Sequence, residues 1–198
     1  MPKQQVGFQR VLYASWLILA VPALVILWRY GIDSISYGQV IHQSGNWSVG
    51  LLALALIVTP LRRVFPNRSW TITLQRLRRA IGVASFAYAA LHTAVYLERK
   101  WGYGYILDEA KDPGLLTGWI ALLIFVALAA TSNNPSVRRL RANWKRLHRL
   151  VYPAAALIFA HWILTALEPL LAWVCLSLLC AVLALRWWPA LKDYLKQT

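Results

Sequence analysis

Six stretches of the chain are almost wholly apolar, and polar or charged segments separate them. They are Val11 to Tyr30, Trp47 to Pro60, Ile81 to Leu97, Leu115 to Ala130, Leu150 to Leu167 and Leu170 to Trp188. A helix needs about 20 apolar residues to cross the hydrocarbon core of a bilayer. Most of the stretches approach that length, so the pattern predicts an all-α membrane protein, a bundle of six transmembrane helices.

The composition agrees with this pattern. The chain has 198 residues, of which 59% are hydrophobic, and its mean hydropathy is +0.50. One soluble domain of this size does not need so many apolar runs of membrane-spanning length. No polar stretch is long enough for a second domain, so we expect one transmembrane domain over residues 1–198.

The formal net charge of +14 permits two explanations, a nucleic-acid surface or the sided charge of a membrane protein. Most Lys and Arg residues fall within residues 62–79 and 138–149, with others before the first apolar run and after the sixth. In a six-helix bundle all these segments lie on one side, and Lys and Arg accumulate in short loops on the cytoplasmic side. We therefore expect cytoplasmic termini, a lipid bilayer around the helices and no nucleic-acid partner.

The four histidines are the main candidates for a functional site. His92 lies inside the third apolar run, His148 stands at the start of the fifth and His161 lies deep within it. An ionisable side chain in a membrane helix is costly and marks a functional site by default, although one histidine can also simply hydrogen-bond to a neighbouring helix. His42 is expected in an outer loop, either solvated or hydrogen-bonded. As a minor alternative it contacts a partner or contributes to an outer redox site.

His92 and His161 are expected at the same depth. The third and fifth runs point the same way through the bundle, and each histidine lies about thirteen residues from the inner edge of its helix. Two neutral imidazoles on facing helices suit the axial ligation of a haem iron. Zinc is disfavoured because it takes four ligands and no Cys or carboxylate is expected at that depth. The pattern predicts an outer haem site between these two residues.

His148 indicates an inner site whose ligation the sequence leaves open. It precedes His161 by thirteen residues, roughly 20 Å of helix, which suits two stacked haems. On a straight helix the two side chains would point roughly 140° apart, so a shared cofactor stack requires a kink, for which Pro153 lies between them. At the depth of His148 the third helix presents Arg78 and Arg79, poor iron ligands that can anchor at the inner surface or pair with haem propionates or a flavin phosphate.

Three segments resemble a known family: GLLALALIVTPLRR, RRAIGVASFAYAALH and LHRLVYPAAALIFAH. Each is a weak signal alone, but their order at this chain length is specific. Together they resemble the ferric-reductase-like transmembrane domain shared by NADPH oxidases and ferric reductases, with a core over about residues 45–167. Within that superfamily the chain is most similar to the haem-binding membrane subunits of bacterial periplasmic methionine sulfoxide reductase systems.

The resemblance implies one or two b-type haems held by His92, His148 and His161, and it leaves room for an FMN. It further implies the bacterial inner membrane as location, a periplasmic molybdopterin-containing reductase subunit as partner, and the quinone pool or a cytosolic flavin reductase as electron donor. Members of the wider superfamily usually carry a second histidine pair where this chain has Arg78 or Arg79.

The wider superfamily also appends a cytosolic nucleotide-binding domain. This sequence has no Gly-rich nucleotide loop. We therefore expect a redox subunit that has no complete catalytic site of its own and receives its electrons from another component.

Two other functions stay open. A proton-coupled transporter would use buried histidines as proton relays, although such proteins usually have broken helices around a repeat-related site and no internal repeat is visible. A stand-alone ferric or oxygen reductase of the cytochrome b type would react at an exposed haem edge. The electron-transfer subunit is the hypothesis that the paired histidines favour.

Overall fold

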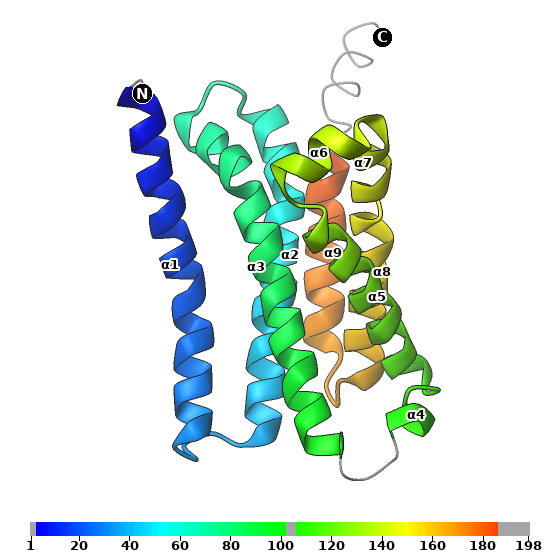
Figure 1. Cartoon of the computed structure of the whole chain (residues 1–198). Coiled ribbons are helices and arrows are strands. Elements are labelled where there is room, and N and C mark those ends of the chain that lie inside the picture. Colours follow the sequence, from blue (N-terminus) through cyan, green and yellow to red (C-terminus); the bar gives the residue numbers. More distant parts are fainter. Residues whose placement is uncertain (1–2, 102–105, 186–198) are drawn as a thin grey trace, which may run out of the picture.

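The computed structural model describes residues 3–101 and 106–185, in which the regular elements are helices (Figure 1). In chain order they are α1 (Lys3–Gly31), α2 (Tyr37–Val64), α3 (Ser69–Lys100), α4 (Ile106–Glu109), α5 (Pro113–Ala130), α6 (Asn134–Leu140), α7 (Ala142–His148), α8 (Val151–Thr165) and α9 (Leu170–Ala184). The predicted all-α fold is confirmed for these residues. The basic residues that follow the sixth apolar run lie outside them.

Five segments are long and apolar enough to cross a bilayer. They are Gln9–Gly31, Tyr37–Val64, Ser69–Lys100, Pro113–Ala130 and Ala142–Thr165. They coincide with the first five apolar runs. The sixth run corresponds to α9, whose 15 residues are fewer than the about 20 that span a bilayer, and residues 186–188 of that run lie outside the described residues. The chain is a multi-pass membrane protein with five candidate transmembrane helices and a shorter apolar helix.

Helix α2 is longer than its apolar run at both ends. Ser36 Oγ accepts the backbone amide of Gln39 at 3.3 Å, and Gln39 Oε1 accepts the amide of Ser36 at 2.8 Å. This reciprocal capping box starts a helix at Tyr37. His42 therefore lies within α2, and its prediction as a loop residue is wrong. At the other end the helix continues past Pro60.

A break separates α7 from α8 directly after His148. The amides of Arg149 and Leu150 each bond to the carbonyl three residues earlier, at 3.2 and 2.9 Å, and not to the fourth. Pro153 lies in the first turn of α8, where its missing N–H costs little. The helix is thus interrupted just before Pro153, close to where a kink is expected. The angle between the His148 and His161 side chains that holds for a straight helix therefore does not apply.

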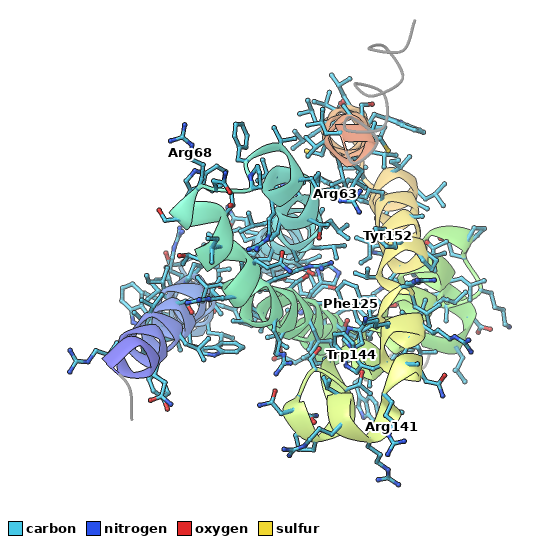
Figure 2. The ribbon with its side chains drawn as sticks, turned by 90° about the horizontal axis from the view of Figure 1, so that it is seen from above. Arg63, Arg68, Phe125, Arg141, Trp144 and Tyr152 are labelled. Atoms are coloured by element: carbon cyan, nitrogen blue, oxygen red, sulfur yellow. The ribbon has the colours of Figure 1, made fainter. Side chains whose placement is uncertain are left out.

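The two ends of the bundle carry different loops and charges. The start of α1, the α2–α3 connection, α6 and α7 lie at one end, named here the α6–α7 end (Figure 1). Figure 2 views this end, with Arg63, Arg68 and Arg141 around it. The α1–α2 connection, α4 and the α8–α9 turn lie at the other, the α4 end. Its residues include Asp33, Asp108 and Glu168. This is the sided charge distribution that the sequence predicts.

Helix α2 lies between two apolar clusters. Buried residues that include Ile26, Leu51 and Tyr88 join it to α1 and α3. A second group, which includes Leu52 and Phe125, joins it to α5, α8 and α9. The pairs α2–α3 and α5–α8 pack together most extensively. The bundle is therefore built from two tightly packed helix pairs, and the site described below lies between them.

Helix α1 is attached to α3 through the hydroxyl of Tyr88. This hydroxyl donates to the carbonyl of Leu19 at 2.8 Å and accepts the amide of Ala23 at 3.0 Å. Those two backbone groups are partners in a regular helix, and the adjacent Pro22 has no N–H. The hydroxyl thus satisfies backbone groups that water cannot reach inside a bilayer.

Candidate cofactor site

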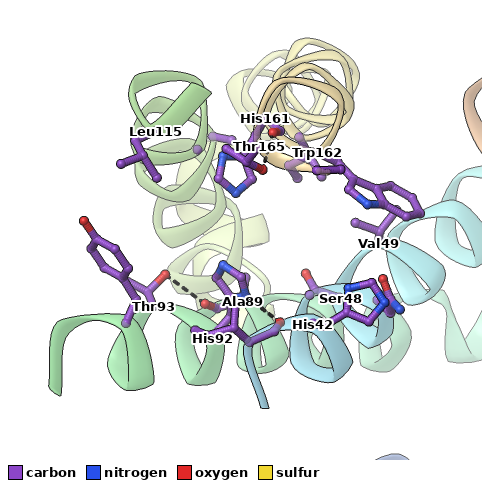
Figure 3. Close-up of a pocket in the computed structure, with 18 of the residues that line it drawn as sticks. His42, Ser48, Val49, Ala89, His92, Thr93, Leu115, His161, Trp162 and Thr165 are labelled. Carbon is purple, nitrogen blue, oxygen red and sulfur yellow. Dashed lines mark hydrogen bonds between the residues drawn. The ribbon is translucent and has the colours of Figure 1, made fainter. Parts of the chain in front are cut away.

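Two histidines from different helix pairs face each other inside the bundle. His92 on α3 and His161 on α8 have ring centroids 6.2 Å apart, with the ring planes at 89°. Figure 3 shows the two rings pointing toward one another. The structure therefore brings together the two residues that the sequence places at the same depth.

The two rings lie in a cavity of about 540 Å³, within the range of about 300–1,000 Å³ typical of cofactor and ligand sites. Helices α2, α3, α5 and α8 supply its walls, which are mostly apolar, with Ala89, Phe125 and Ile158 among the lining residues. It reaches Gly38 and Glu168 at the α4 end. The cavity is thus a slot between the two helix pairs.

Backbone carbonyls determine which nitrogen of each ring carries the proton. Nδ1 of His92 lies 3.0 Å from the carbonyl oxygen of Ile41, and Nδ1 of His161 lies 2.8 Å from that of Gly114. A carbonyl only accepts hydrogen bonds, so Nδ1 must donate in both rings. In the neutral imidazole this leaves the lone pair on Nε2, the nitrogen that metal ligation requires.

Glycines allow the rings to approach these carbonyls. A Cβ at Gly118 on α5 would lie 2.8 Å from Nδ1 of His161, and one at Gly45 on α2 would lie 3.3 Å from Nδ1 of His92. On α5 a further glycine, Gly114, has Thr165 and Leu164 of α8 next to it. This small-xxx-small spacing brings two membrane helices close together.

The pair fits the axial positions of a haem iron. An iron held by both rings would lie about 2 Å from one nitrogen of each, which places the ring centroids about 6 Å apart. The observed separation is 6.2 Å. In the part of the chain that the structure describes, no group of three His, Cys, Asp or Glu side chains forms a metal-binding cluster. A haem brings its own equatorial nitrogens and takes only axial ligands from the protein.

His148 has different surroundings at the α6–α7 end. Its ring stacks on Trp144 with centroids 4.0 Å apart, and its Nε2 lies 3.1 Å from Thr131 Oγ1. The Thr131 hydroxyl also contacts the carbonyl of Ala127 at 2.7 Å. Because a hydroxyl both donates and accepts, this hydrogen bond engages Nε2 of His148 without determining which ring nitrogen carries the proton. Nε2 of this ring is thus engaged by a side chain, whereas the other two rings form their hydrogen bonds at Nδ1.

Arg78 and Arg79 both bind groups on neighbouring segments. Arg78 Nε donates to the carbonyl of Ala55 at 3.0 Å, and an Arg79 amino group donates to Asn134 Oδ1 at 2.7 Å. Both guanidinium groups also lie near enough to act electrostatically on His148. The structure thus places all three sequence-predicted inner residues at the same end of the bundle.

Helix α4 is attached to α3 beside the cavity. Glu109 accepts from Lys100 Nζ at 2.6 Å and from the Tyr96 hydroxyl at 2.8 Å. The hydrogen bond from Lys100, followed by that from Tyr96, lowers the pKa of the Glu109 carboxyl. Tyr96 also lines the cavity, so this ionised carboxylate connects α4 to the cavity wall.

Several residues of the site were not found by sequence reasoning. Asn46 lines the cavity from α2, and so does His42, which the sequence indicated only as a minor alternative. The capping box SYGQ before them is the sequence signal that places them on a helix. The Gly114 and Gly118 pair has the small-xxx-small spacing that indicates close helix packing. Nothing in the sequence alone indicates that Gly45 contacts His92.

The sequence is similar to known proteins. It matches the family described as ferric reductase like transmembrane component over residues 44–159. Three relatives are each named a protein-methionine-sulfoxide reductase heme-binding subunit, MsrQ. The protein from Ralstonia nicotianae is 37% identical over 165 residues, 79% of this chain and 73% of that protein. The protein from Xanthomonas axonopodis pv. citri is 34% identical, over 69% of this chain and 63% of its own length. The protein from Brucella ovis is 32% identical, over 91% of this chain and 83% of its own length.

Proposed function

Since the chain belongs to the ferric-reductase-like transmembrane family, and within it to the MsrQ heme-binding subunits, we propose that it is the electron-transfer subunit of a protein-methionine-sulfoxide reductase. It binds b-type haem through His92 and His161. The observation that carries this proposal is the facing pair of imidazoles, 6.2 Å apart, each with its Nδ1 on a backbone carbonyl.

The residues around the pair have distinct roles in this proposal. Bound haem supplies a one-electron redox centre whose potential depends on its axial ligands and their hydrogen bonds. His92 and His161 bind and orient it through Nε2. The carbonyls of Ile41 and Gly114 hold the ring protons at Nδ1. The apolar walls of the cavity, which include Phe125, keep water away from the iron.

The proposed orientation of the bundle rests on its charge distribution, and the proposed direction of transfer rests on the family resemblance. We place six helices across the bacterial inner membrane, with both termini and the basic α6–α7 end in the cytoplasm. The cavity reaches Glu168 at the α4 end, which then faces the periplasm. Electrons leave there to a periplasmic reductase subunit that contains a molybdopterin cofactor. The quinone pool or a cytosolic flavin reductase supplies them.

At the α6–α7 end we propose His148 as the ligand of a second haem. Arg78 and Arg79 lie at the same end of the bundle, and guanidinium groups pair with carboxylates such as haem propionates. To bind iron through Nε2, His148 must first give up its hydrogen bond to Thr131. An FMN stays a prediction from the family resemblance.

A pyridine haemochromogen assay on the purified protein tests the proposal. We expect haem b at one or more per chain. A well-folded preparation without haem b would overturn the proposal, and a colourless protein would favour the transporter.

A second measurement distinguishes the electron-transfer subunit from a stand-alone reductase. The dithionite-reduced protein is mixed either with a ferric chelate or with the purified reductase subunit, and its reoxidation is followed. We expect much faster reoxidation by the reductase subunit. Equally fast reoxidation by the chelate would indicate that the protein acts alone.

A further inference from the structure

The two cavity histidines contact their neighbouring helices in the same way. His92 bonds to the carbonyl of Ile41, and Gly45, four residues later on α2, lies against its ring. His161 also bonds to a carbonyl, and Gly118 on α5 lies against its ring four residues after that carbonyl. Residues four apart are neighbours on one helix face. The segments IHQSG and GLLTG share only their last residue, so the likeness is one of geometry.

The space at each glycine is already filled by the histidine ring. A Cβ at Gly118 would lie 2.8 Å from Nδ1 and 3.0 Å from Cε1 of His161, closer than the about 3.5 Å at which non-bonded atoms pack. At Gly45 the corresponding distances to His92 are 3.3 and 3.6 Å. A methyl group added at Gly118 must therefore displace the ring of His161, and one added at Gly45 crowds the ring of His92 less.

We infer that Gly45 and Gly118 are positioning residues for the axial ligands, an inference that rests on the proposed haem function. Each glycine gives one histidine ring access to the backbone carbonyl that orients it. Mutation of a side chain cannot remove that carbonyl. The glycine is therefore the position at which the sequence controls how well the ring reaches its acceptor.

The effect on the cofactor follows from the hydrogen bond at Nδ1. An imidazole that donates from Nδ1 to an acceptor is more basic toward the metal at Nε2 and is held in one orientation. A methyl group that pushes the ring off its carbonyl weakens both effects. A less basic ligand stabilises ferric iron less, so the midpoint potential of the haem rises and its affinity falls.

Alanine substitutions in the full-length protein test this inference. The test variants are Gly118→Ala and Gly45→Ala. The controls are Gly50→Ala on α2 and Gly82→Ala on α3, where a Cβ would meet nothing within 4 Å. Alanine is the better helix former, so none of these substitutions weakens its own helix. The measurements are the haem-to-protein ratio, the electron paramagnetic resonance spectrum of the oxidised protein and the midpoint potential.

We expect Gly118→Ala to lower haem affinity by about 10- to 100-fold, the range for losing a partner of a metal ligand, with an altered low-spin spectrum and a raised potential. Gly45→Ala should change the same quantities in the same direction but less. Gly50→Ala and Gly82→Ala should match the unmodified protein. If Gly118→Ala does not fold, the spectrum and the midpoint potential of Gly45→Ala test the positioning role instead.

The failure of this inference differs from the failure of the proposed function. If the unmodified protein holds no haem, the proposed function fails. If it holds haem and both test variants have the spectrum and potential of the controls, the positioning role is wrong. Equal changes in test and control variants would also overturn it, since they would indicate a general effect of removing glycine from the bundle.

Discussion

Histidines at the two ends of this bundle are held by different kinds of group. His92 and His161 face each other across a cavity, and each donates its Nδ1 proton to a backbone carbonyl. His148, at the α6–α7 end, stacks on Trp144, and its Nε2 shares a hydrogen bond with the Thr131 hydroxyl. The first arrangement leaves Nε2 with a free lone pair, whereas the second uses Nε2 for a hydrogen bond.

All three residues are histidines, so the difference lies in which ring nitrogen is left free to bind a metal. A backbone carbonyl cannot donate a proton, so it holds one tautomer regardless of the side chains nearby. A threonine hydroxyl both donates and accepts, so the tautomer at His148 depends on where the Thr131 hydroxyl proton goes. At the α4 end both rings therefore keep Nε2 free of hydrogen bonds to the carbonyls, while at the α6–α7 end Nε2 of His148 is engaged by Thr131.

Removal of either facing histidine should have the largest effect. We expect His92→Ala or His161→Ala to reduce the haem bound at the outer site to less than about a tenth, because one of two axial ligands is lost. The measurement is the haem-to-protein ratio by pyridine haemochromogen. His42→Ala is the control, since this residue lines the same cavity but is not proposed as a ligand. Loss of the outer spectrum in His42→Ala and its retention in His92→Ala would reverse the assignment.

Substitutions at the inner end should have a smaller effect. His148→Ala is expected to leave the outer spectrum unchanged and to remove at most the second haem. Thr131→Val removes the hydroxyl that hydrogen-bonds to Nε2 of His148 and should raise occupancy of the inner site. The measurement is the number of haems per chain together with the reduced-minus-oxidised spectrum. An outer spectrum that is lost in His148→Ala would contradict the separation of the two ends.

Hydrogen bonds within the α2–α3 pair should have a modest effect on stability. The buried Ser48 and Ser85 each donate to the other's backbone carbonyl, at 3.0 and 2.8 Å. We expect Ser85→Ala to lower the free energy of unfolding in detergent micelles by about 1 kcal/mol, since one interhelical hydrogen bond is lost. Thr73→Ala, whose hydroxyl bonds only within α3 to Ser69, serves as control and should change less. Equal destabilisation by both variants would show that the interhelical bond contributes nothing.

The smallest expected effect is a pH dependence at the α4 end. Hydrogen bonds from Lys100 and then Tyr96 lower the pKa of Glu109 in the folded protein. The ionised carboxylate therefore stabilises the attachment of α4 above the usual range of a Glu carboxyl, about pH 4.3, and this stabilisation is lost as the pH falls through the lowered pKa.

Hydrogen exchange of the Ala110, Lys111 and Asp112 amides, which bond to carbonyls of α4, measures this dependence between neutral and acidic pH. After correction for the intrinsic exchange rate, we expect protection to fall in acid in the unmodified protein. In Glu109→Gln it should not vary with pH. A Glu98→Gln control should retain the dependence of the unmodified protein, and an identical acid response in Glu109→Gln would assign the effect to other groups.

Most of the fold follows from the apolar pattern. The first five apolar runs coincide with the five candidate spans, because a bilayer requires long uninterrupted apolar helices. The helix ends were less predictable. Helix α2 begins at Tyr37 because Ser36 and Gln39 form a capping box, which an inspection of apolar runs does not detect.

The candidate site was predictable in part. The sequence by itself determined that His92 and His161 lie at similar depth, since helical rise converts residue number into distance along the membrane normal. It also placed His148 and the two arginines at the same end.

Only the tertiary structure decided how those histidines are used. The tautomers depend on which carbonyl or hydroxyl lies beside each ring, and the partners Ile41 and Gly114 come from helices far away in the sequence. The roles of Gly45 and Gly118 have the same origin. A glycine in a membrane helix has no chemistry of its own, and it gains a function only when packing brings another side chain into the space where its Cβ would be.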